Sequence, residues 1–160
     1  MKTDVEDILD AVKLILTTHL NTKIQAINAE KADAYTLKEI NDSAYFLQTM
    51  DAAQANYDPY IFYGVGEMAD EPAPYPGGRT AYRLDLDVLI VVADHGNDVN
   101  IGRRMLRYQR ALKEVFEEHF DELPGRSKLS VKSQVPVTIQ LLNSSHRHRV
   151  VGVLLGTDLA

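Results

Sequence analysis

The segment that most constrains the fold of this chain runs from Tyr82 to Val92, where two kinds of side chain alternate strictly. A period of two is typical of a β-strand, because successive side chains point to opposite faces of the sheet. One face of this segment is apolar throughout. The other face begins with charged residues and ends with Leu89 and Val91. The pattern predicts a strand that is solvated on one side in its first half and buried on both sides in its second half.

A long amphipathic helix is expected at the start of the sequence. Thr3 and Glu6 have the spacing of a capping box, in which each side chain satisfies a backbone N–H at the helix start. Apolar residues then recur at helical spacing as far as Leu20. The polar pair at 21–22 interrupts this stripe, so we expect the helix to continue to about Ala34 with a bend.

A second helix is expected from Thr36 to about Ala55. Thr36 and Glu39 repeat the capping-box spacing. The helix should end before Asp58–Pro59, because the residue before a proline avoids the helical region. Apolar residues that would share one face follow the cap, namely Leu37, Ile40, Ala44 and Leu47.

The pattern changes after Pro59. Tyr60–Tyr63 is a short aromatic and β-branched run, which predicts a strand. A loop is expected from Gly64 to about Gly78, because prolines and glycines that break regular structure gather there. A loop of this length is long for a compact domain, and long loops are usually functional or mobile.

A third helix and a hairpin complete the chain. Apolar residues at helical spacing predict a helix over residues 101–120. Two strands, at about 128–142 and 146–155, are joined by a short polar turn and predict a hairpin. Pro136 cannot donate a hydrogen bond to a neighbouring strand, so it indicates a bulge or a sheet edge.

These elements follow the order α-α-β-β-α-β-β. The order predicts an α+β fold, a small and mostly antiparallel sheet of four strands with helices packed on it. The chain has 160 residues, which is enough for one domain and short for two. We therefore expect a single α+β domain over residues 1–160, with a helical N-terminal part at 1–56 and a sheet–helix core at 57–160.

The composition excludes several classes of function. The chain has no cysteine, which excludes disulfides, thiolate metal sites and cysteine nucleophiles. Its formal net charge of −6 argues against general nucleic-acid binding. No apolar run approaches the ~18 residues that cross a membrane, and the acidic first residues lack the apolar stretch of a signal peptide. The charge is uneven, since residues 126–160 are basic on an otherwise acidic chain, and such asymmetry can steer partners into register.

Two carboxylates on the long strand are a candidate for metal chemistry. Asp85 and Asp87 point to the same side of a strand, and Gly77-Gly78 precedes them. Nucleotidyltransferases hold Mg²⁺ on such a pair, but the accompanying serine is absent and no third carboxylate is evident. We interpret the pair as the solvent-facing half of the strand and keep a nucleotidyltransferase-like enzyme as an alternative.

The histidines predict no metal site. His146 and His148 share one face of a strand, but arginines flank them and no third ligand is evident, so they are interpreted as exposed strand residues. His19 is interpreted as a packing residue, and His95 and His119 have no evident partner. No serine lies in a nucleophile motif. We therefore expect no catalytic residue, no metal and no cofactor, and a protein that is not an enzyme.

An arginine-rich helix face is the candidate interaction surface. Arg103, Arg107 and Arg110 fall within about two turns, and the first two are like charges at a spacing that is mildly unfavourable. Arginine is the charged residue most enriched in protein interfaces. We predict that these three residues form an interface together with Arg147 and Arg149 of the hairpin, with a solvated face as the alternative.

The order of elements over residues 57–155 resembles that of a known family. A short strand and a Pro/Gly-rich loop lead to the long strand Ala81–Val92 and then to a helix of the form Ile101-x-x-Arg-x-x-Arg-Tyr-x-x-Ala-Leu112, and a hairpin closes the domain. This arrangement resembles the tail-terminator and tail-completion proteins of long-tailed bacteriophages and the neighbouring neck and joining proteins. The helix expected at 36–55 is long for that family.

The resemblance implies a virion structural protein without catalysis or cofactor. Such proteins form a hexameric ring that caps the finished tail tube, stops its growth and joins it to the head connector. The expected partners are further copies of this chain and the tail-tube and head-connector proteins, with no specific nucleic acid and no membrane. The expected locations are the virion and, during assembly, the host cytoplasm. A host-encoded adaptor domain with the same fold is a further alternative.

Overall fold

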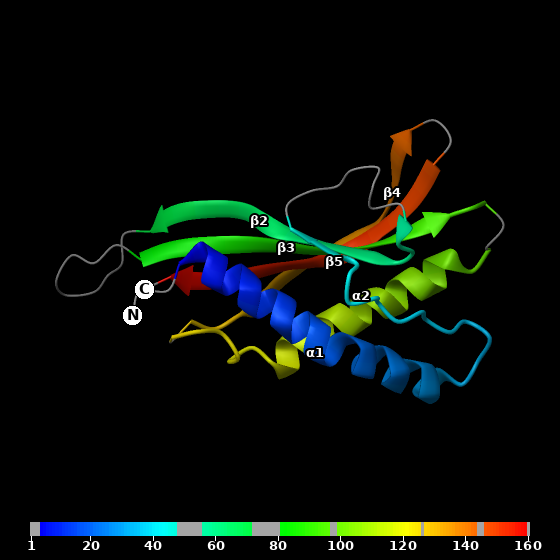
Figure 1. The fold of residues 1–160 in the computed structure, drawn as a ribbon, viewed down its shortest axis with the longest axis horizontal. Helices are drawn as coiled ribbons and strands as arrows, with labels where there is room; N and C mark the ends of the chain where they lie inside the picture. Colours follow the sequence, from blue (N-terminus) through cyan, green and yellow to red (C-terminus); the bar gives the residue numbers. More distant parts are fainter. Residues whose placement is uncertain are drawn as a thin grey trace.

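The computed structural model describes residues 4–47, 56–71, 81–96, 99–125, 127–143 and 146–159. These residues form an α+β fold of two helices and one five-stranded sheet (Figure 1). In chain order the elements are α1 (Val5–Lys31), β1 (Tyr45–Leu47), β2 (Tyr60–Glu71), β3 (Ala81–Asp94), α2 (Ile101–Glu118), β4 (Ser130–Asn143) and β5 (His146–Leu159). None of the described helices is long and apolar enough to span a membrane.

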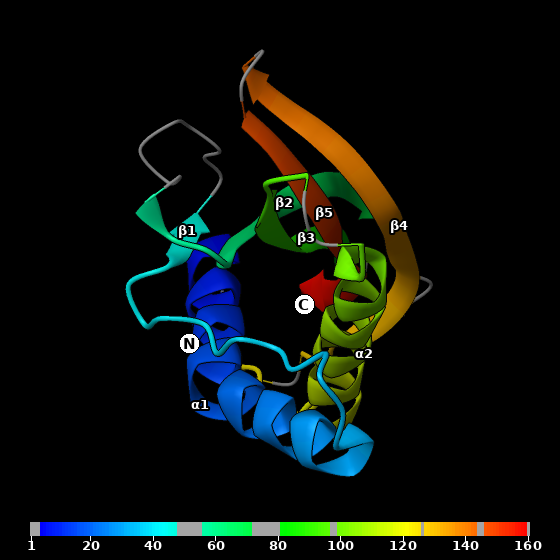
Figure 2. The same ribbon diagram turned by 90° about the vertical axis from the view of Figure 1, so that its right-hand side faces the viewer.

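The strands follow the order β1-β2-β3-β5-β4, and all neighbours are antiparallel except β1 and β2, which are parallel. Both helices lie on the same face of this curved sheet (Figure 2). The α+β class and the mostly antiparallel sheet are therefore confirmed. The expected four strands and the order α-α-β-β-α-β-β are wrong in detail, because a fifth strand, β1, stands where a second helix was expected.

The core lies between the helices and the sheet face they cover. The alternation in β3 has the predicted effect, since Leu84, Leu86, Val88 and Ile90 are all buried there. Rows of directly opposed residues continue this face across three strands, namely Ile61–Ile90–Val151 and Tyr63–Val88–Val153. The helices contribute the complementary stripes, which include Ile8, Val12, Leu16, Leu20 and Ile24 from α1 and Met105, Leu112, Val115 and Phe116 from α2.

Helix α1 begins one residue later than the sequence spacing predicts. Asp4 is the N-cap, its carboxylate accepts from the Asp7 amide at 2.9 Å, and Asp7 accepts from the Asp4 amide at 3.0 Å. Thr3, which was expected to cap the helix, lies outside the described residues. The helix continues to Lys31 without the expected interruption at 21–22, and it ends at Ala32, whose φ of 46° is left-handed.

The predicted second helix is wrong, because side chains of α1 hold this segment in an extended form. The Asn28 side chain donates to the Leu37 carbonyl at 3.0 Å and accepts from the Leu37 amide at 2.8 Å. Two turns earlier in α1, Asn21 makes the same pair of bonds to the backbone of Ile40, at 2.9 and 2.7 Å. The two asparagines thus replace the backbone bonds that a helix over this segment would make for itself. The chain then enters β1, and residues 48–55 lie outside the described residues.

The expected loop from Gly64 is also wrong over its first half. Strand β2 continues to Glu71 and pairs with β3 along its whole length. Gly64 pairs regularly with Asp87, and Gly66 lies in an irregularity, a register shift between Val65 and Glu67. A strand-breaking composition therefore produced a bulge in a long hairpin arm, as glycine within a strand often does. The prolines of the expected loop lie outside the described residues.

The terminal hairpin is confirmed. Strands β4 and β5 pair antiparallel, and β4 is the edge of the sheet. Pro136 lies within a register shift between Val135 and Thr138. Both features inferred from this proline, a bulge and an edge, are present, because a residue without an N–H is tolerated where no regular ladder bond is needed.

Gly152 marks a close approach between β5 and β3. A Cβ at this position would lie 2.1 Å from the Val88 carbonyl oxygen and 2.7 Å from Leu89 Cδ2. Both distances are shorter than van der Waals contact, so a side chain at Gly152 would force the two central strands apart. The absence of a side chain is therefore required for the packing of the sheet.

We predict that replacing both asparagines of α1, as Asn21→Ala with Asn28→Ala, lowers the free energy of unfolding by about 2–4 kcal/mol, because each leaves partly buried backbone groups without partners. Urea denaturation of the single and double variants measures the effect. Thr22→Ala is the control, since it removes a small polar side chain from the exposed part of the same helix. Equal stability of the double variant and the control would contradict a stabilising role for the two asparagines.

We also predict that Gly152→Ala lowers the free energy of unfolding by about 1–3 kcal/mol, because the added methyl overpacks two central strands. Gly102→Ala in α2 is the control, since nothing lies within 4 Å of a Cβ there. In a helix, alanine is favoured over glycine by roughly 0.5–1 kcal/mol, so this variant should gain stability. A neutral Gly152→Ala variant would show that the strands separate without cost.

Candidate functional site

Arg107, one of the predicted interface residues, is directed into its own chain. Its side chain is only 9% exposed, and its two terminal nitrogens contact the Asp33 carboxylate at 2.8 and 2.5 Å. One of them also donates to the Tyr35 carbonyl at 2.8 Å. A forked contact of this kind fixes both position and orientation, so Arg107 anchors the segment after α1 onto α2.

Arg110 and Arg103 lie beside it on α2 and differ in their contacts. Arg110 forms a second fork with Glu30 of α1, at 3.0 and 2.8 Å, and its Nε donates to Glu114 at 2.8 Å. Arg103 is exposed, and its guanidinium lies 5.0 Å from the centre of the Tyr35 ring. The predicted arginine face is therefore divided, with two residues engaged between the helices and Arg103 at the surface.

Arg147 and Arg149 lie at the start of β5. Arg147 is exposed, whereas Arg149 is partly buried and donates to Asp94 at 2.9 Å. Because Arg147 is opposite Asp94 in the register of β3 and β5, both arginines lie at the end of the sheet from which the chain enters α2. An interface through these residues and Arg103 stays a prediction.

A polar seam joins α1 to α2 along their length. Its middle is Lys23, whose ammonium lies 2.6 Å from Glu118 and 3.6 Å from Glu114. The two helices are antiparallel, so residue numbers fall along α1 as they rise along α2. The contacts in order are Glu30–Arg110, Lys23–Glu114, Lys23–Glu118 and His19–Glu122. No contact between these charges was predicted from the sequence. The structure gives each of them a partner on the other helix or in the turn after it.

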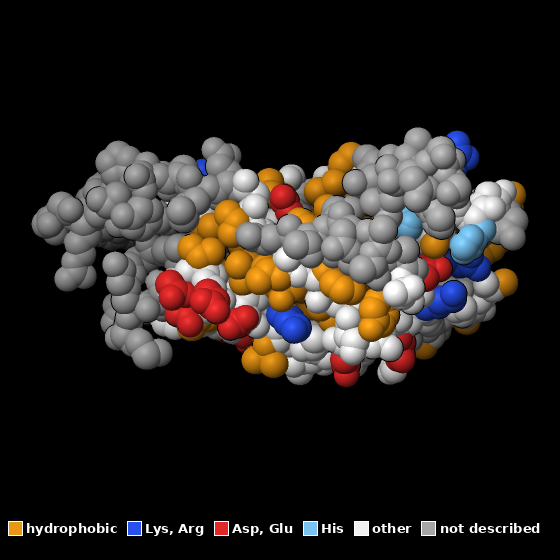
Figure 3. Space-filling view, turned by 45° about the horizontal axis from the view of Figure 1, so that its top comes forward, with side chains coloured by type: hydrophobic (Ala, Val, Ile, Leu, Met, Phe, Trp, Pro, Cys, Tyr) orange, Lys and Arg blue, Asp and Glu red, His pale blue; other side chains and the backbone are white. Residues whose placement is uncertain are grey.

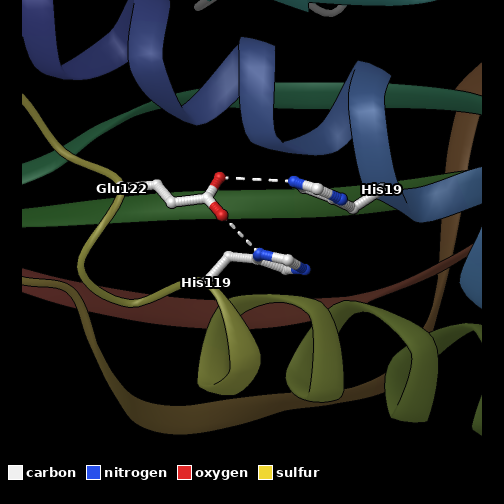
Figure 4. A group of neighbouring side chains, drawn as sticks. All are labelled: His19, His119 and Glu122. Carbon is white, nitrogen blue, oxygen red and sulfur yellow. Dashed lines mark hydrogen bonds and ion pairs between the residues drawn. The ribbon is translucent and has the colours of Figure 1, made fainter.

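The last contact of the seam is a cluster of His19, His119 and Glu122, drawn in Figure 4. One Glu122 oxygen lies 3.2 Å from His19 Nε2, and the other lies 2.6 Å from His119 Nδ1. The two imidazole rings stack with centroids 3.5 Å apart and planes within 8°. Hydrogen bonds from His119 and His19 hold the pKa of the Glu122 carboxyl below its usual value.

This cluster is the candidate site that sequence reasoning missed. His19 comes from α1, His119 is the C-cap of α2, and Glu122 belongs to the turn after α2. The three atoms that face one another lie within 4.8 Å, a spacing suited to a metal ion. Only the pair His119-x-x-Glu122 is local in sequence, so no spacing pattern could include His19, which is brought in by the packing of α1 on α2.

The expectation that His148 is an exposed strand residue is wrong. The residue is buried, and its ring lies edge-on to Tyr60 with centroids 6.4 Å apart. Strand β5 is an interior strand, and Tyr60 also contacts Phe46, which in turn contacts Tyr57. The side chain of His146 lies outside the described residues, so the predicted pairing of the two histidines is not tested.

The Asp85–Asp87 pair lies on the sheet face opposite the helices. Lys132 Nζ is 2.8 Å from Asp85, and Arg83 Nε is 3.6 Å from it. Burial and the neighbouring Asp85 charge raise the pKa of Asp87. A polar hollow of about 290 Å³ lies beside the pair, lined by Arg83, Ser130, Lys132, Gly156, Thr157 and Asp158.

The ammonium of Lys132 takes the place that a metal ion would hold at Asp85, so this geometry lends the pair no support as a Mg²⁺ site. Gly77-Gly78, the other half of the predicted motif, lies outside the described residues. The nucleotidyltransferase-like alternative stays a prediction without a favourable contact.

We predict that the Asp33–Arg107 pair makes stability depend on acid pH. Hydrogen bonds from Arg107, and one from the Tyr35 amide, hold the pKa of Asp33 well below its usual range. The native state therefore binds fewer protons than the unfolded state, so this stabilisation is present above about pH 4 and is lost as pH falls further. Asp33→Asn should be less stable than wild type at pH 7 and should lose less stability between pH 5 and 2.5.

Urea denaturation across that pH range is the measurement. Arg107→Gln should flatten the profile to a similar extent, because it removes the other half of the same pair, and the double variant should add little further change. An unchanged acid slope in both single variants would exclude the pair as its source.

Comparisons with known proteins identify no family for this chain. No family model matches the sequence, and no curated protein is similar to it. Among solved structures, one chain aligns over 94% of this chain and 94% of its own length, with 16% sequence identity and a TM-score of 0.37. A likeness of that degree carries no conclusion about function.

Proposed function

We propose that this chain is the subunit of a ring-forming virion protein of the tail-terminator or tail-completion type. In that role it caps a phage tail tube and joins it to the head connector. The observation that carries the proposal is the separation of charge along the molecule. Acidic side chains gather at the end where α1 begins, and basic side chains lie at the opposite end, where α2 begins (Figure 3).

Each of these ends has an exposed patch that combines charge with an apolar side chain. The acidic patch consists of Glu6, Asp10 and Leu14, which are spaced four residues apart on one face of α1 and of which Leu14 is 66% exposed. The basic patch consists of Val99, Arg103 and Leu106 at the start of α2, with Val99 94% and Leu106 60% exposed. Apolar residues rimmed by charge are the usual composition of a protein interface.

Two different patches at opposite ends are what a ring requires. A closed ring uses a heterologous contact, in which one surface of each subunit meets a different surface of the next. The acidic patch of one copy and the basic patch of its neighbour are complementary, and such complementarity fixes register and excludes wrong partners. The edge strand β4 is a poorer route to association, because Pro136 and the register shifts interrupt its free edge.

The division of the arginine face supports the same surface. Arg107 and Arg110 are already forked to carboxylates of their own chain, so a second partner would have to displace those contacts. Arg103 lies against the Tyr35 ring and near Asp33, whose pKa its charge helps to lower, but no carboxylate of its own chain is forked to it among the contacts described, and its side chain is exposed. The interface proposed here therefore uses Arg103 and leaves Arg107 and Arg110 to hold the helices together.

We predict that reversing either patch prevents ring formation and that reversing both restores it. Asp10→Lys and Arg103→Glu each place like charges across the proposed contact, which should weaken association at least about tenfold. The double variant exchanges the two charges and recovers the attraction. Native mass spectrometry and light scattering measure the oligomer, for which six copies are expected, and circular dichroism verifies the fold.

Arg103→Lys is the control, because it keeps the charge and should keep the ring. A wild-type protein that stays monomeric at high concentration and does not bind tail-tube subunits would overturn the assignment. If wild type forms a ring and both single-reversal variants form it equally well, the protein is an oligomer but these patches are not the contact between its subunits.

A further inference from the structure

We propose that His19, His119 and Glu122 form a binding site for a divalent first-row transition metal, with Zn²⁺ as the preferred ion. Two imidazole nitrogens and one carboxylate are a ligand set that binds zinc and leaves positions open for water. Mg²⁺ and Ca²⁺ prefer sites made of oxygen atoms alone, so this donor set selects against them. The proposal concerns the junction of the two helices and does not depend on the proposed ring.

The spacing of the ligand atoms fits a tetrahedral ion. Ligands bound at zinc–nitrogen distances of about 2.0–2.1 Å lie roughly 3.3 Å from one another. His19 Nε2 and His119 Nδ1 lie 3.2 and 2.6 Å from the two Glu122 oxygens, and the three facing atoms lie within 4.8 Å of one another. The cluster is therefore assembled close to the required size by the packing of α1 on the end of α2.

Binding requires a modest rotation of one ring. The two imidazoles are parallel and 3.5 Å apart, and a metal bound by both must lie near the plane of each, which parallel planes do not allow. All three side chains are partly exposed, so one imidazole can turn without opening the core. The metal then takes the place of the two contacts that Glu122 makes with the rings in Figure 4.

The charge around the cluster favours a cation. Helix α2 ends at Glu118 with no basic residue in its last turn, so the partial negative charge of its carbonyl end is uncompensated by a side chain of that turn. Glu118 is close enough to both histidines for its charge to interact with theirs. Lys23, the neighbouring cation of the seam, is paired with Glu118 and Glu114. Lys128 lies over the Phe120 ring.

A metal here would fasten α1 to the turn after α2. The contacts now made by Glu122 are exposed hydrogen bonds, which contribute little individually. Coordination would replace them with bonds that hold two segments about a hundred residues apart, and it would stabilise the native state in proportion to metal concentration. The site would therefore extend the polar seam with a stronger final link.

The experiment uses full-length protein treated with EDTA and then dialysed. At a Zn²⁺ concentration about 100 times the dissociation constant, the melting temperature should rise by about 5–10 °C, whereas Mg²⁺ should have no effect. Isothermal titration calorimetry should give one Zn²⁺ per chain. Co²⁺ should produce the visible absorption of a four- or five-coordinate ion, which reports the donor geometry directly.

Three variants and a control assign the ligands. His19→Gln, His119→Gln and Glu122→Gln should each weaken Zn²⁺ binding at least about tenfold, and circular dichroism verifies that each is folded. His95→Gln is the control, because His95 is exposed and outside the cluster, and it should bind as wild type does. Zinc affinity that is only millimolar, or that survives all three substitutions, would overturn the site, and neither result bears on ring formation.

Discussion

The arrangement of this molecule depends on how the segment after α1 is held between the two helices. Arg107 forks onto Asp33 at the start of that segment, and the side chains of Asn28 and Asn21 then bind the backbone of residues 37–40. An extended chain with its polar groups satisfied in this way has no need to form a helix. It therefore reaches the sheet and adds β1 beside β2 as a fifth strand.

The same contacts determine which charges are available for association. A guanidinium that is forked to a carboxylate of its own chain is already paired, so a second interface would have to displace that contact. Arg107 and Arg110 belong to this group, whereas Arg103 remains at the surface. The proposed contact between subunits therefore uses the ends of the two helices, and the seam between them keeps those ends at a fixed separation.

How far the sequence predicts this fold depends on the range of the interactions concerned. The alternation in β3, the apolar stripes of both helices and the bulge at Pro136 are local signals, and the structure confirms each of them. The expected helix at 36–55 is wrong over residues 36–47, and the expected loop from Gly64 is wrong as far as Glu71. In both places the local signal was overruled by partners distant in sequence, the asparagines of α1 for the first and β3 for the second.

The candidate sites follow the same division. Arginines at helical spacing marked one face of α2, yet spacing alone could not separate the residues that turn inward from the one that stays outside. The His19–His119–Glu122 cluster could not be recognised from the sequence, because only the packing of α1 against the end of α2 brings His19 to the local pair His119–Glu122.

The sequence by itself therefore determined the periodic elements, the α+β class and the uneven charge, since each depends on neighbours within a few turns or one strand. Tertiary structure alone decided the fifth strand, the polar seam and the histidine cluster. The physical reason is that a side chain's hydrogen-bond partner is selected by distance in space, and here the decisive partners lie between 9 and 103 residues away along the chain.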